Sequence, residues 1–600
     1  MLTLLIAIGA FLAYLIAYHT YGKWLSQKIF GLDPRRTTPA VAQEDGCDYV
    51  PTNKSVVFGH HFTSIAGTGP IVGPALAVIW GWLPALLWVL FGSIFVGAVH
   101  DFGALVVSLR HRGQTVGEVA GSVLSKRAKL LFLCILFLAL TIVLAIFGLV
   151  IAAVFKAYPQ AILPCLFQIP LAIIIGNFLH QGKISLLIPS LVALALMYLT
   201  VYYGNTGFLG KFNNHLASWP VIIWVAILLI YSYVASVLPV WLLLQPRDYI
   251  NSLQLVSTLA LIAVGLVVAA FFGLEQGGSK QTLQIAAPAI RWHPTGAPFL
   301  FPFLFITIAC GAISGFHCLV SSGTSSKQLD NEGSAQFVGY GAMLTEGFLA
   351  VIVILACVAG LGLGIPEVLE DKTTGRLLTG AAAYDARYES WQNAQGLADK
   401  VGSFIDGAAN FLKALGLPAT FAVAMMGVFV ASFAATTLDT ACRLQRYVTQ
   451  ELASQLRFRP LEHTHRATLF AITLAAIIAA LPAPNTSWEL NNLGKGGLFL
   501  WPLFGATNQL LGGLSFLVIL FWLKIRNKPI WFLIPPTLLM LILPGIALLL
   551  NLLHGPSAWL LGDEPNFLLS SFALLTLLLE VWILREGLLA WKNAPLSHDS

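Results

Sequence analysis

Long apolar stretches recur along the whole chain and are separated by short polar segments. Because a transmembrane helix needs about 20 consecutive and mainly apolar residues, fifteen of these stretches are predicted to cross a membrane. They are residues 2–22, 59–80, 82–108, 129–156, 162–180, 184–203, 219–246, 251–275, 299–321, 336–364, 418–441, 466–483, 497–523, 529–552 and 565–591. The pattern therefore predicts an all-α polytopic membrane protein with about 15 transmembrane helices.

The composition agrees with a membrane protein. Of the 600 residues, 57% are hydrophobic and only 10% are charged, against about 25% charged residues in soluble domains. The net charge of +6 is attributed to basic loops, so no nucleic-acid partner is expected. The fifteen spans place 23 of the 33 lysine and arginine residues on one side. The positive-inside rule assigns that side to the cytoplasm, with the N-terminus outside and the C-terminus inside.

One predicted span has a composition that disfavours a continuous helix. The stretch "GHHFTSIAGTGPIVGPALA" (Gly59–Ala77) contains Pro70 and Pro74 together with several glycines. Proline removes a backbone donor and clashes with the preceding turn, and freed backbone groups inside a membrane are tolerated where they line a cavity. We expect a broken helix that binds a small-molecule substrate, although a proline kink with glycines for close helix packing remains an alternative. The expected substrate-binding residues are His60, His61, Ser64, Gly67, Thr68, Gly69, Pro70 and Pro239.

A second span with two prolines suggests an internal repeat. Pro239 and Pro246 lie in or at the end of span 219–246, so we expect this span to be a second broken helix. Each proline-containing span is the first of a group of five spans. Because five is an odd number, the direction of crossing reverses between the two groups. This is the pattern of inverted-repeat transporters. We therefore expect an N-terminal accessory helix and cytoplasmic linker (1–58), a first five-helix repeat (59–203), a second repeat with an extracytoplasmic segment at 365–417 (204–452), and C-terminal accessory helices (453–600).

Polar residues inside the spans are candidates for binding a coupling cation. Hydroxyl groups of Ser314, Ser321 and Ser322 on the apolar helix "FITIACGAISGFHCLVSSGTSS" (Phe305–Ser326) suit sodium, unless they bond back to their own helix. Ionisable groups are costly inside a membrane and often functional. Asp101, His317 and Glu346 are therefore candidates to carry a proton, and we favour the proton over sodium. Asp439 is expected to pair locally with Arg443, four residues further on.

Other classes of activity receive less support. His60, His61, His100 and His317 with Asp101 do not have a diagnostic metal-ligand spacing, so we expect neither a metal nor a cofactor. The sequence has no GxxxxGK[ST] phosphate loop and no HExxH or GxSxG motif. An ATP-driven pump and an enzyme are therefore not expected, whereas a membrane sensor on a transporter scaffold remains an alternative.

Several blocks of the chain resemble the carbon starvation protein A family. They are "LDPRRTTPAVAQEDGCDYVPTNKSVVFGHHFTSIAGTGPIVGPALA" (Leu32–Ala77), "GAVHDFGALVVSLRHRGQTVGEV" (Gly97–Val119), "VLPVWLLLQPRDY" (Val237–Tyr249), "LFPFLFITIACGAISGFHCLVSSGTSSKQL" (Leu300–Leu329) and "GLFLWPLFGATNQLL" (Gly497–Leu511). The resemblance implies import of peptides or small carboxylates such as pyruvate across the bacterial cytoplasmic (inner) membrane, with relatives that are proton-coupled. It leaves the solute and the oligomeric state open.

Overall fold

The structure is a computed structural model that describes residues 1–180, 186–368, 374–395, 397–482, 486–494, 500–555 and 557–593. The expected span ends at 184, 483 and 497 lie outside these residues. In the N-terminal half the helices are α1 (Leu2–Ala17), α2 (Pro39–Ala42), α3 (Lys54–Ile65), α4 (Gly69–Ala77), α5 (Trp82–Gly92), α6 (Ala98–Leu109), α7 (Val116–Val123), α8 (Lys126–Ala157), α9 (Ile162–His180), α10 (Leu187–Tyr203), α11 (Gly207–Ala217), α12 (Val221–Val237) and α13 (Leu244–Phe272).

The second half is also mainly helical. Its helices are α14 (Leu300–Thr307), α15 (Gly315–Gly323), α16 (Ala342–Leu355), α17 (Gly380–Tyr388), α18 (Trp391–Gln395), α19 (Leu397–Ala414), α20 (Ala419–Gln455), α21 (Thr464–Ala479), α22 (Trp501–Ile525), α23 (Ile534–Leu553) and α24 (Phe567–Asn593). In the described residues, two antiparallel hairpins are the only sheets: β1 (Leu274–Gln276) with β2 (Ser279–Gln281), and β3 (Ile365–Val368) with β4 (Thr374–Leu378).

The expectation of a helical membrane protein is confirmed. However, fewer helices than the fifteen expected are long and apolar enough to cross a membrane. Among the described residues, ten helical segments qualify, or up to twelve if each of two bent helix pairs counts as one span. The remaining three expected spans correspond to α12, with 17 residues, α21, with 16 residues, and the short pair α14 and α15. A helix of 17 residues is only about 26 Å long, so these segments fall below the usual spanning length.

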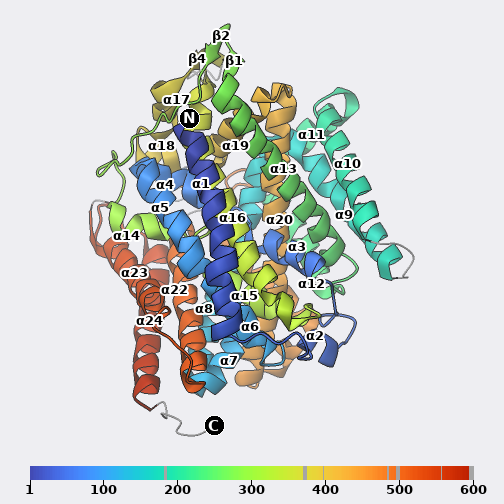
Figure 1. Cartoon of the computed structure of the whole chain (residues 1–600). Coiled ribbons are helices and arrows are strands. Elements are labelled where there is room, and N and C mark those ends of the chain that lie inside the picture. Colours follow the sequence, from blue (N-terminus) through green and yellow to red (C-terminus); the bar gives the residue numbers. More distant parts are fainter. Residues whose placement is uncertain are drawn as a thin grey trace.

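The bundle has two distinct ends (Figure 1). α1 starts at the end that carries the β-hairpins and α17, and α2 and α7 lie at the opposite end. Segment 365–417, apart from its undescribed residues, covers α4. The Tyr388 hydroxyl donates to the Ala75 carbonyl at 2.7 Å, and the Tyr384 hydroxyl donates to the Val78 carbonyl at 2.8 Å.

Besides the pair α10 and α11, which is bent by 84°, two further breaks in the described helices concern the candidate site. α3 and α4 are separated by Ala66–Thr68, and the pair is bent by 45° at this point. α14 and α15 are separated by the non-helical segment 308–314. Gly311 has a φ of +86° in this segment, a left-handed conformation that glycine adopts without steric cost. The single apolar helix expected for Phe305–Ser326 is therefore wrong, because the chain is interrupted before His317.

Span 219–246 is also interrupted, but by a turn between two separate helices and not by a break within one helix. α12 ends at Val237, and Leu238 is extended with φ −72° and ψ 152°, as expected for a residue that precedes proline. Pro239 therefore lies in the turn between α12 and α13. Pro246 lies in the first turn of α13, where its missing N–H costs no hydrogen bond. These prolines end one helix and begin the next.

The longest helices form the framework around the broken segments. α8 packs along α20, and α12 packs against α21. α20 also contacts α3 through small and polar side chains. The hydroxyl oxygens of Ser64 and Thr440 lie 3.1 Å apart, and the Thr437 hydroxyl donates to the Ser64 carbonyl at 3.0 Å. Small residues permit such close helix packing, so the first break lies directly against α20.

Candidate functional site

The two broken helices meet backbone to backbone. A Cβ atom added to Gly69 would lie 2.6 Å from the Cβ atom of Cys310, and one added to Gly73 would lie 2.6 Å from the carbonyl oxygen of Thr307. These glycines therefore permit the close approach of α4 to the end of α14. The alternative interpretation, that the glycines permit close helix packing, is therefore correct at these two positions. The helix is also broken just before them, at Ala66–Thr68.

Four ionisable side chains form a buried chain beside the second break. Asp101, on α6, accepts from two histidines: its Oδ1 atom lies 2.8 Å from Nδ1 of His100, and its Oδ2 atom lies 2.9 Å from Nδ1 of His317. The Nε2 atom of His317, on α15, lies 3.4 Å from Oε2 of Glu346, on α16. All of these side chains are fully buried. Asp101, His317 and Glu346, which the sequence analysis selected separately, are brought together from three helices.

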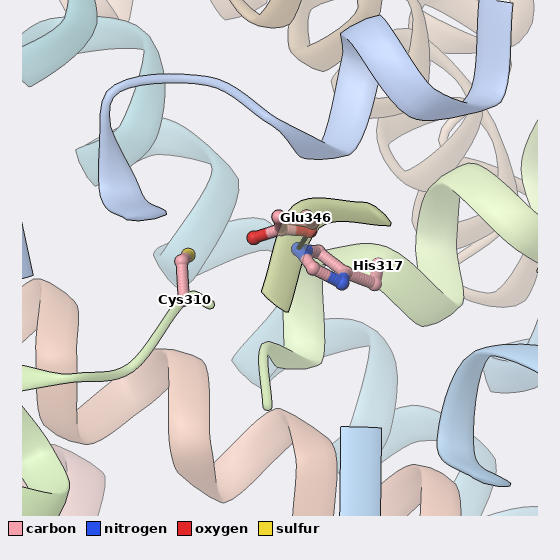
Figure 2. Close-up of side chains that lie close together, drawn as sticks. All are labelled: Cys310, His317 and Glu346. Atoms are coloured by element: carbon pink, nitrogen blue, oxygen red, sulfur yellow. Dashed lines mark ion pairs between the residues drawn. The ribbon is translucent and has the colours of Figure 1, made fainter. Parts of the chain in front are cut away.

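The hydrogen bonds define where a proton is held. An ionised Asp101 only accepts hydrogen bonds, so Nδ1 of His317 carries a hydrogen. The remaining pair, Nε2 of His317 and Oε2 of Glu346, then needs one proton between them, either as imidazolium with carboxylate or as imidazole with carboxylic acid. Figure 2 shows the imidazole facing the carboxylate. The other oxygen, Oε1 of Glu346, accepts from the Gly311 backbone N–H at 2.9 Å, so Glu346 also holds the broken segment.

A thiol lies next to this pair. The donor atoms of Cys310, His317 and Glu346 all lie within 4.8 Å of one another (Figure 2), which is close enough for side chains to hold a metal ion. However, a single shared proton satisfies both the imidazole and the carboxylate. His317 also bonds to Asp101, and Glu346 also accepts from the Gly311 backbone N–H, so a bound proton fits the group as it stands.

The three serines expected to bind a cation have different surroundings. The Ser314 hydroxyl lies 3.2 Å from Oδ1 of Asn508, and the Ser322 hydroxyl donates back to the Cys318 carbonyl at 2.6 Å. The alternative of back-bonding is therefore correct for Ser322. The Ser321 hydroxyl is buried and has no hydrogen-bond partner in the described part of the chain.

Asn508 is a residue of this site that sequence reasoning missed. Its Oδ1 atom accepts from the Phe316 backbone N–H at 2.8 Å, so α22 holds the first turn of α15. The signal was present in the sequence as the polar run Thr507, Asn508 and Gln509 inside an apolar span.

The residues expected to bind substrate at the first break lie on different faces of α3. The Nδ1 atom of His61 lies 2.8 Å from the Ser325 hydroxyl, and His60 points to α13. Thr68 begins α4, and its buried hydroxyl has no hydrogen-bond partner among the residues that the structure describes. Gly67 packs against Thr437 and Phe147, and Pro70 follows in the first turn of α4.

Pro239 does not belong to this group. The residue after it, Val240, donates its backbone N–H to the Cys47 carbonyl at 3.0 Å. Cys47 precedes the start of α3 at Lys54, so Pro239 lies beside the loop that leads into α3. The reason is the turn between α12 and α13, which the sequence analysis placed inside a span.

Asp439 has a partner that is distant in the sequence. The expected local pair with Arg443 is wrong, because Asp439 bonds to Arg247 of α13, with Oδ1 lying 3.0 Å from one guanidinium nitrogen. The predicted spans place Arg247 in the loop after residue 246, but its side chain is buried in the structure. Arg443 instead pairs with Asp48 in the loop before α3. Although burial acts to raise the pKa of Asp48, Arg443 and Arg446 beside it lower the pKa to about 2.

Comparison with known proteins agrees with the resemblance found in the sequence. The chain matches the family described as carbon starvation protein CstA over residues 2–547. It is 32% identical over 548 residues to the peptide transporter CstA of Campylobacter jejuni subsp. jejuni serotype O:2, covering 86% of this chain and 75% of that protein.

Two proteins of Escherichia coli (strain K12) are similarly related. The peptide transporter CstA is 33% identical over 575 residues, covering 90% of this chain and 79% of the relative. The pyruvate/proton symporter BtsT is 33% identical over 595 residues, covering 91% of this chain and 81% of the relative. With a match that extends over most of its length, the chain belongs to the carbon starvation protein CstA family.

Proposed function

We propose that the chain is a secondary active transporter that imports peptides or small carboxylates such as pyruvate, and that protons drive the import. The names of its relatives support this proposal, since they include peptide transporters and a pyruvate/proton symporter. They also support transport rather than catalysis as the activity. The bacterial cytoplasmic membrane is the proposed location.

The single observation that carries the proton proposal is the pairing of His317 with Glu346. One proton fits between Nε2 and Oε2, and the same carboxylate accepts from Gly311 in the broken segment. Loss of that proton leaves a lone pair facing a carboxylate, which is repulsive. The release of Glu346 would then loosen its hold on the segment between α14 and α15. Proton occupancy is in this way linked to the conformation of a broken helix.

Sodium receives less support from the same region. The hydroxyl groups of Ser314 and Ser322 already have partners in Asn508 and Cys318. A sodium ion would have to compete for these oxygens, whereas the proton site is formed by groups that titrate.

We further propose an inverted repeat with boundaries different from 59–203 and 204–452. The first half would comprise α3 with α4, α5 with α6, α8, α12 and α13, and the second would comprise α14 with α15, α16, α20, α21 and α22. Each half begins with a broken helix. The corresponding helices α8 and α20 pack together, as do α12 and α21. The expected orientation, with the N-terminus outside, is supported by the basic loops next to α2 and α7, which include Arg35, Arg36, Arg110 and Arg112.

Substrate is proposed to bind at the break between α3 and α4. The start of α4 presents the backbone N–H of Gly69 and the unpaired hydroxyl of Thr68. A helix N-terminus favours a carboxylate, which peptides and pyruvate share. His61, Ser64, Gly67 and Pro70 remain part of this proposal. We propose that His60, whose ring bonds Asp248 of α13, and Pro239, beside the loop that leads into α3, lie outside the substrate site.

The test is uptake by the purified protein in proteoliposomes. A labelled dipeptide and labelled pyruvate are supplied separately under a pH gradient, a sodium gradient or no gradient. We expect accumulation of one of them under the pH gradient alone. Accumulation that responds only to sodium would reject proton coupling, and binding without uptake of either solute would favour a sensor.

A further inference from the structure

A second buried group of ionisable side chains lies on the other side of α3. The Nδ1–H group of His60 donates to Oδ2 of Asp248 at 2.5 Å. Asp248 also accepts from Arg247, with Oδ1 lying 2.6 Å from a guanidinium nitrogen. Arg247 in turn pairs with Asp439 of α20, and the Tyr231 hydroxyl lies 3.0 Å from Oδ2 of Asp439. The group joins α3, α12, α13 and α20.

Considered by themselves, the ionisable side chains of this group balance in charge only with a bound proton. It contains two carboxylates and one guanidinium, so its net charge is −1 when His60 is neutral and zero when His60 is protonated. The side chains of His60, Arg247, Asp248 and Asp439 are at most 3% exposed. An uncompensated charge is costly at such a position. The structure thus contains a buried imidazole hydrogen-bonded to a carboxylate where one positive charge is missing.

The neighbouring elements carry other charged groups, but among the described residues Asp248 is the only one that bonds to the His60 ring. The titratable and charged residues on the elements packed against α3 are Arg247, Asp248 and Tyr249 of α13, Asp439, Cys442, Arg443, Arg446, Tyr447 and Glu451 of α20, His317 and Cys318 of α15, Lys327 after α15, Tyr340 before α16 and Glu346 of α16. Of these, Arg443 and Arg446 pair with Asp48. His61, next in sequence, contacts Ser325. The Nε2 atom of His60 is buried and has no hydrogen-bond partner in the described ranges.

We propose that His60 and Asp248 form a second proton-binding site, separate from Asp101, His317 and Glu346, so that two protons move with each substrate. This inference rests on the proposed function, because it requires proton-driven transport. The proton adds to the imidazole and leaves from it, and no other bond changes. With the proton bound, His60 fixes α3 to α13 and α20, and without it the negative group holds α3 less strongly.

The number of protons per substrate is measured from the point of zero net flux. Proteoliposomes carry a tenfold substrate gradient at zero membrane potential, and the opposing pH gradient is varied. With two protons, a tenfold gradient is balanced by about 0.5 pH unit, and with one proton by about 1 pH unit. We expect about 0.5 for the wild type and about 1 for His60→Asn, whose amide can still donate to Asp248 but does not titrate.

The control is His111→Asn. His111 lies beyond the end of α6, and its Nδ1 atom lies 2.8 Å from the Val107 carbonyl of its own helix. This variant should balance at the wild-type value. Asp248→Asn is a second variant for the site and should also balance at about 1 pH unit.

Each result decides the inference. A wild type that balances at about 1 pH unit would overturn the second site and leave the proposed function intact. His60→Asn at the wild-type value would also overturn it. A wild type whose flux ignores the pH gradient would overturn both proposals. If neither variant carries substrate, the wild-type value alone decides: two protons support the second site and one proton rejects it.

Discussion

The Nε2 atom of His317 lies 3.4 Å from the Oε2 atom of Glu346, and neither atom has a hydrogen-bond partner elsewhere in the described chain. The two residues come from the helix after a break and from the next long helix. Because Asp101 fixes the hydrogen on Nδ1 of His317 and Gly311 occupies Oε1 of Glu346, the two free atoms are matched for one proton. This relationship connects the ionisable groups to the backbone of the break.

Asp101→Asn tests how the histidine is oriented. An amide offers one acceptor and one donor, so it cannot accept from both His100 and His317. We expect the inside-to-outside substrate ratio under a pH gradient to fall to about one. The reason is that the proton at His317 and Glu346 controls the break between α14 and α15, so its loss stops net transport even if His60 still binds its own proton. Exchange of labelled for unlabelled substrate at equal concentrations should persist. Glu580→Gln is the matched control, because Glu580 is a buried carboxylate packed against Gly545 of α23, away from the two breaks, and it should accumulate substrate normally. Full accumulation by Asp101→Asn would contradict the assignment.

Gly69→Val tests the contact between the two breaks. A Cβ atom at this position would lie 2.6 Å from the Cβ atom of Cys310, and overpacking of this kind costs about 1–3 kcal/mol. We expect transport to fall by about 5- to 150-fold while folded protein remains in the membrane, as judged by size-exclusion chromatography. Gly9→Val in α1, where a Cβ atom meets nothing within 4 Å, should transport at the wild-type rate. Unchanged uptake by Gly69→Val would place the substrate path elsewhere.

The hydrophobic pattern was sufficient to predict a helical membrane protein and the first broken helix. The break after Ile65 follows a local cause, the glycines and prolines of residues 67–74. The break at residues 308–314 contains no proline, and only Gly311 marks its left-handed turn. Pro239 and Pro246 were interpreted as breaking a single helix, but they lie where one helix ends and the next begins. Proline is compatible with either arrangement, so its presence alone did not distinguish them.

The candidate proton residues were predicted as individuals, but their pairing was not. Asp101 and His317 are 216 positions apart, and no local pattern reports such a contact. For Asp439, the spacing to Arg443 favoured a local pair, yet Arg247, 192 positions away, binds it in the structure. Local spacing gave the wrong partner because the buried guanidinium comes from another helix.

The ion pair between Arg247 and Asp439 predicts a large effect on stability. Removing one member of a buried pair leaves an uncompensated charge and costs about 3–5 kcal/mol. Arg247→Gln leaves the carboxylates of Asp248 and Asp439 without their cation and should therefore unfold in detergent at a clearly lower temperature than the wild type. Asp385→Asn removes a partly exposed pair with Arg291 at 3.4 Å, which is worth about 0–1 kcal/mol, and should unfold almost like the wild type. Equal unfolding temperatures for the two variants would argue against a buried network.

Asp48 predicts a loss of stability in acid. Its pKa of about 2 in the folded protein lies below the ordinary value of 3.8, because Arg443 and Arg446 outweigh the effect of burial. The charged carboxylate therefore contributes about 2 kcal/mol above pH 3.8, and this contribution is lost as the pH falls toward 2. Thermal unfolding in detergent between pH 5 and pH 2 should show this loss in the wild type and in the exposed-residue control Asp330→Asn. If Asp48→Asn shows the same acid-dependent loss as the wild type, the ion pair is not responsible.

Proton movement on addition of substrate tests the central claim most directly. Proteoliposomes that contain a pH-sensitive dye are mixed with substrate at equal internal and external pH, and the internal pH is followed. The account predicts internal acidification with the wild type and none with Glu346→Gln, although the variant still exchanges labelled for unlabelled substrate. Acidification by Glu346→Gln at the wild-type rate, or substrate entry into wild-type vesicles without any acidification, would contradict the claim that the proton between His317 and Glu346 is coupled to transport.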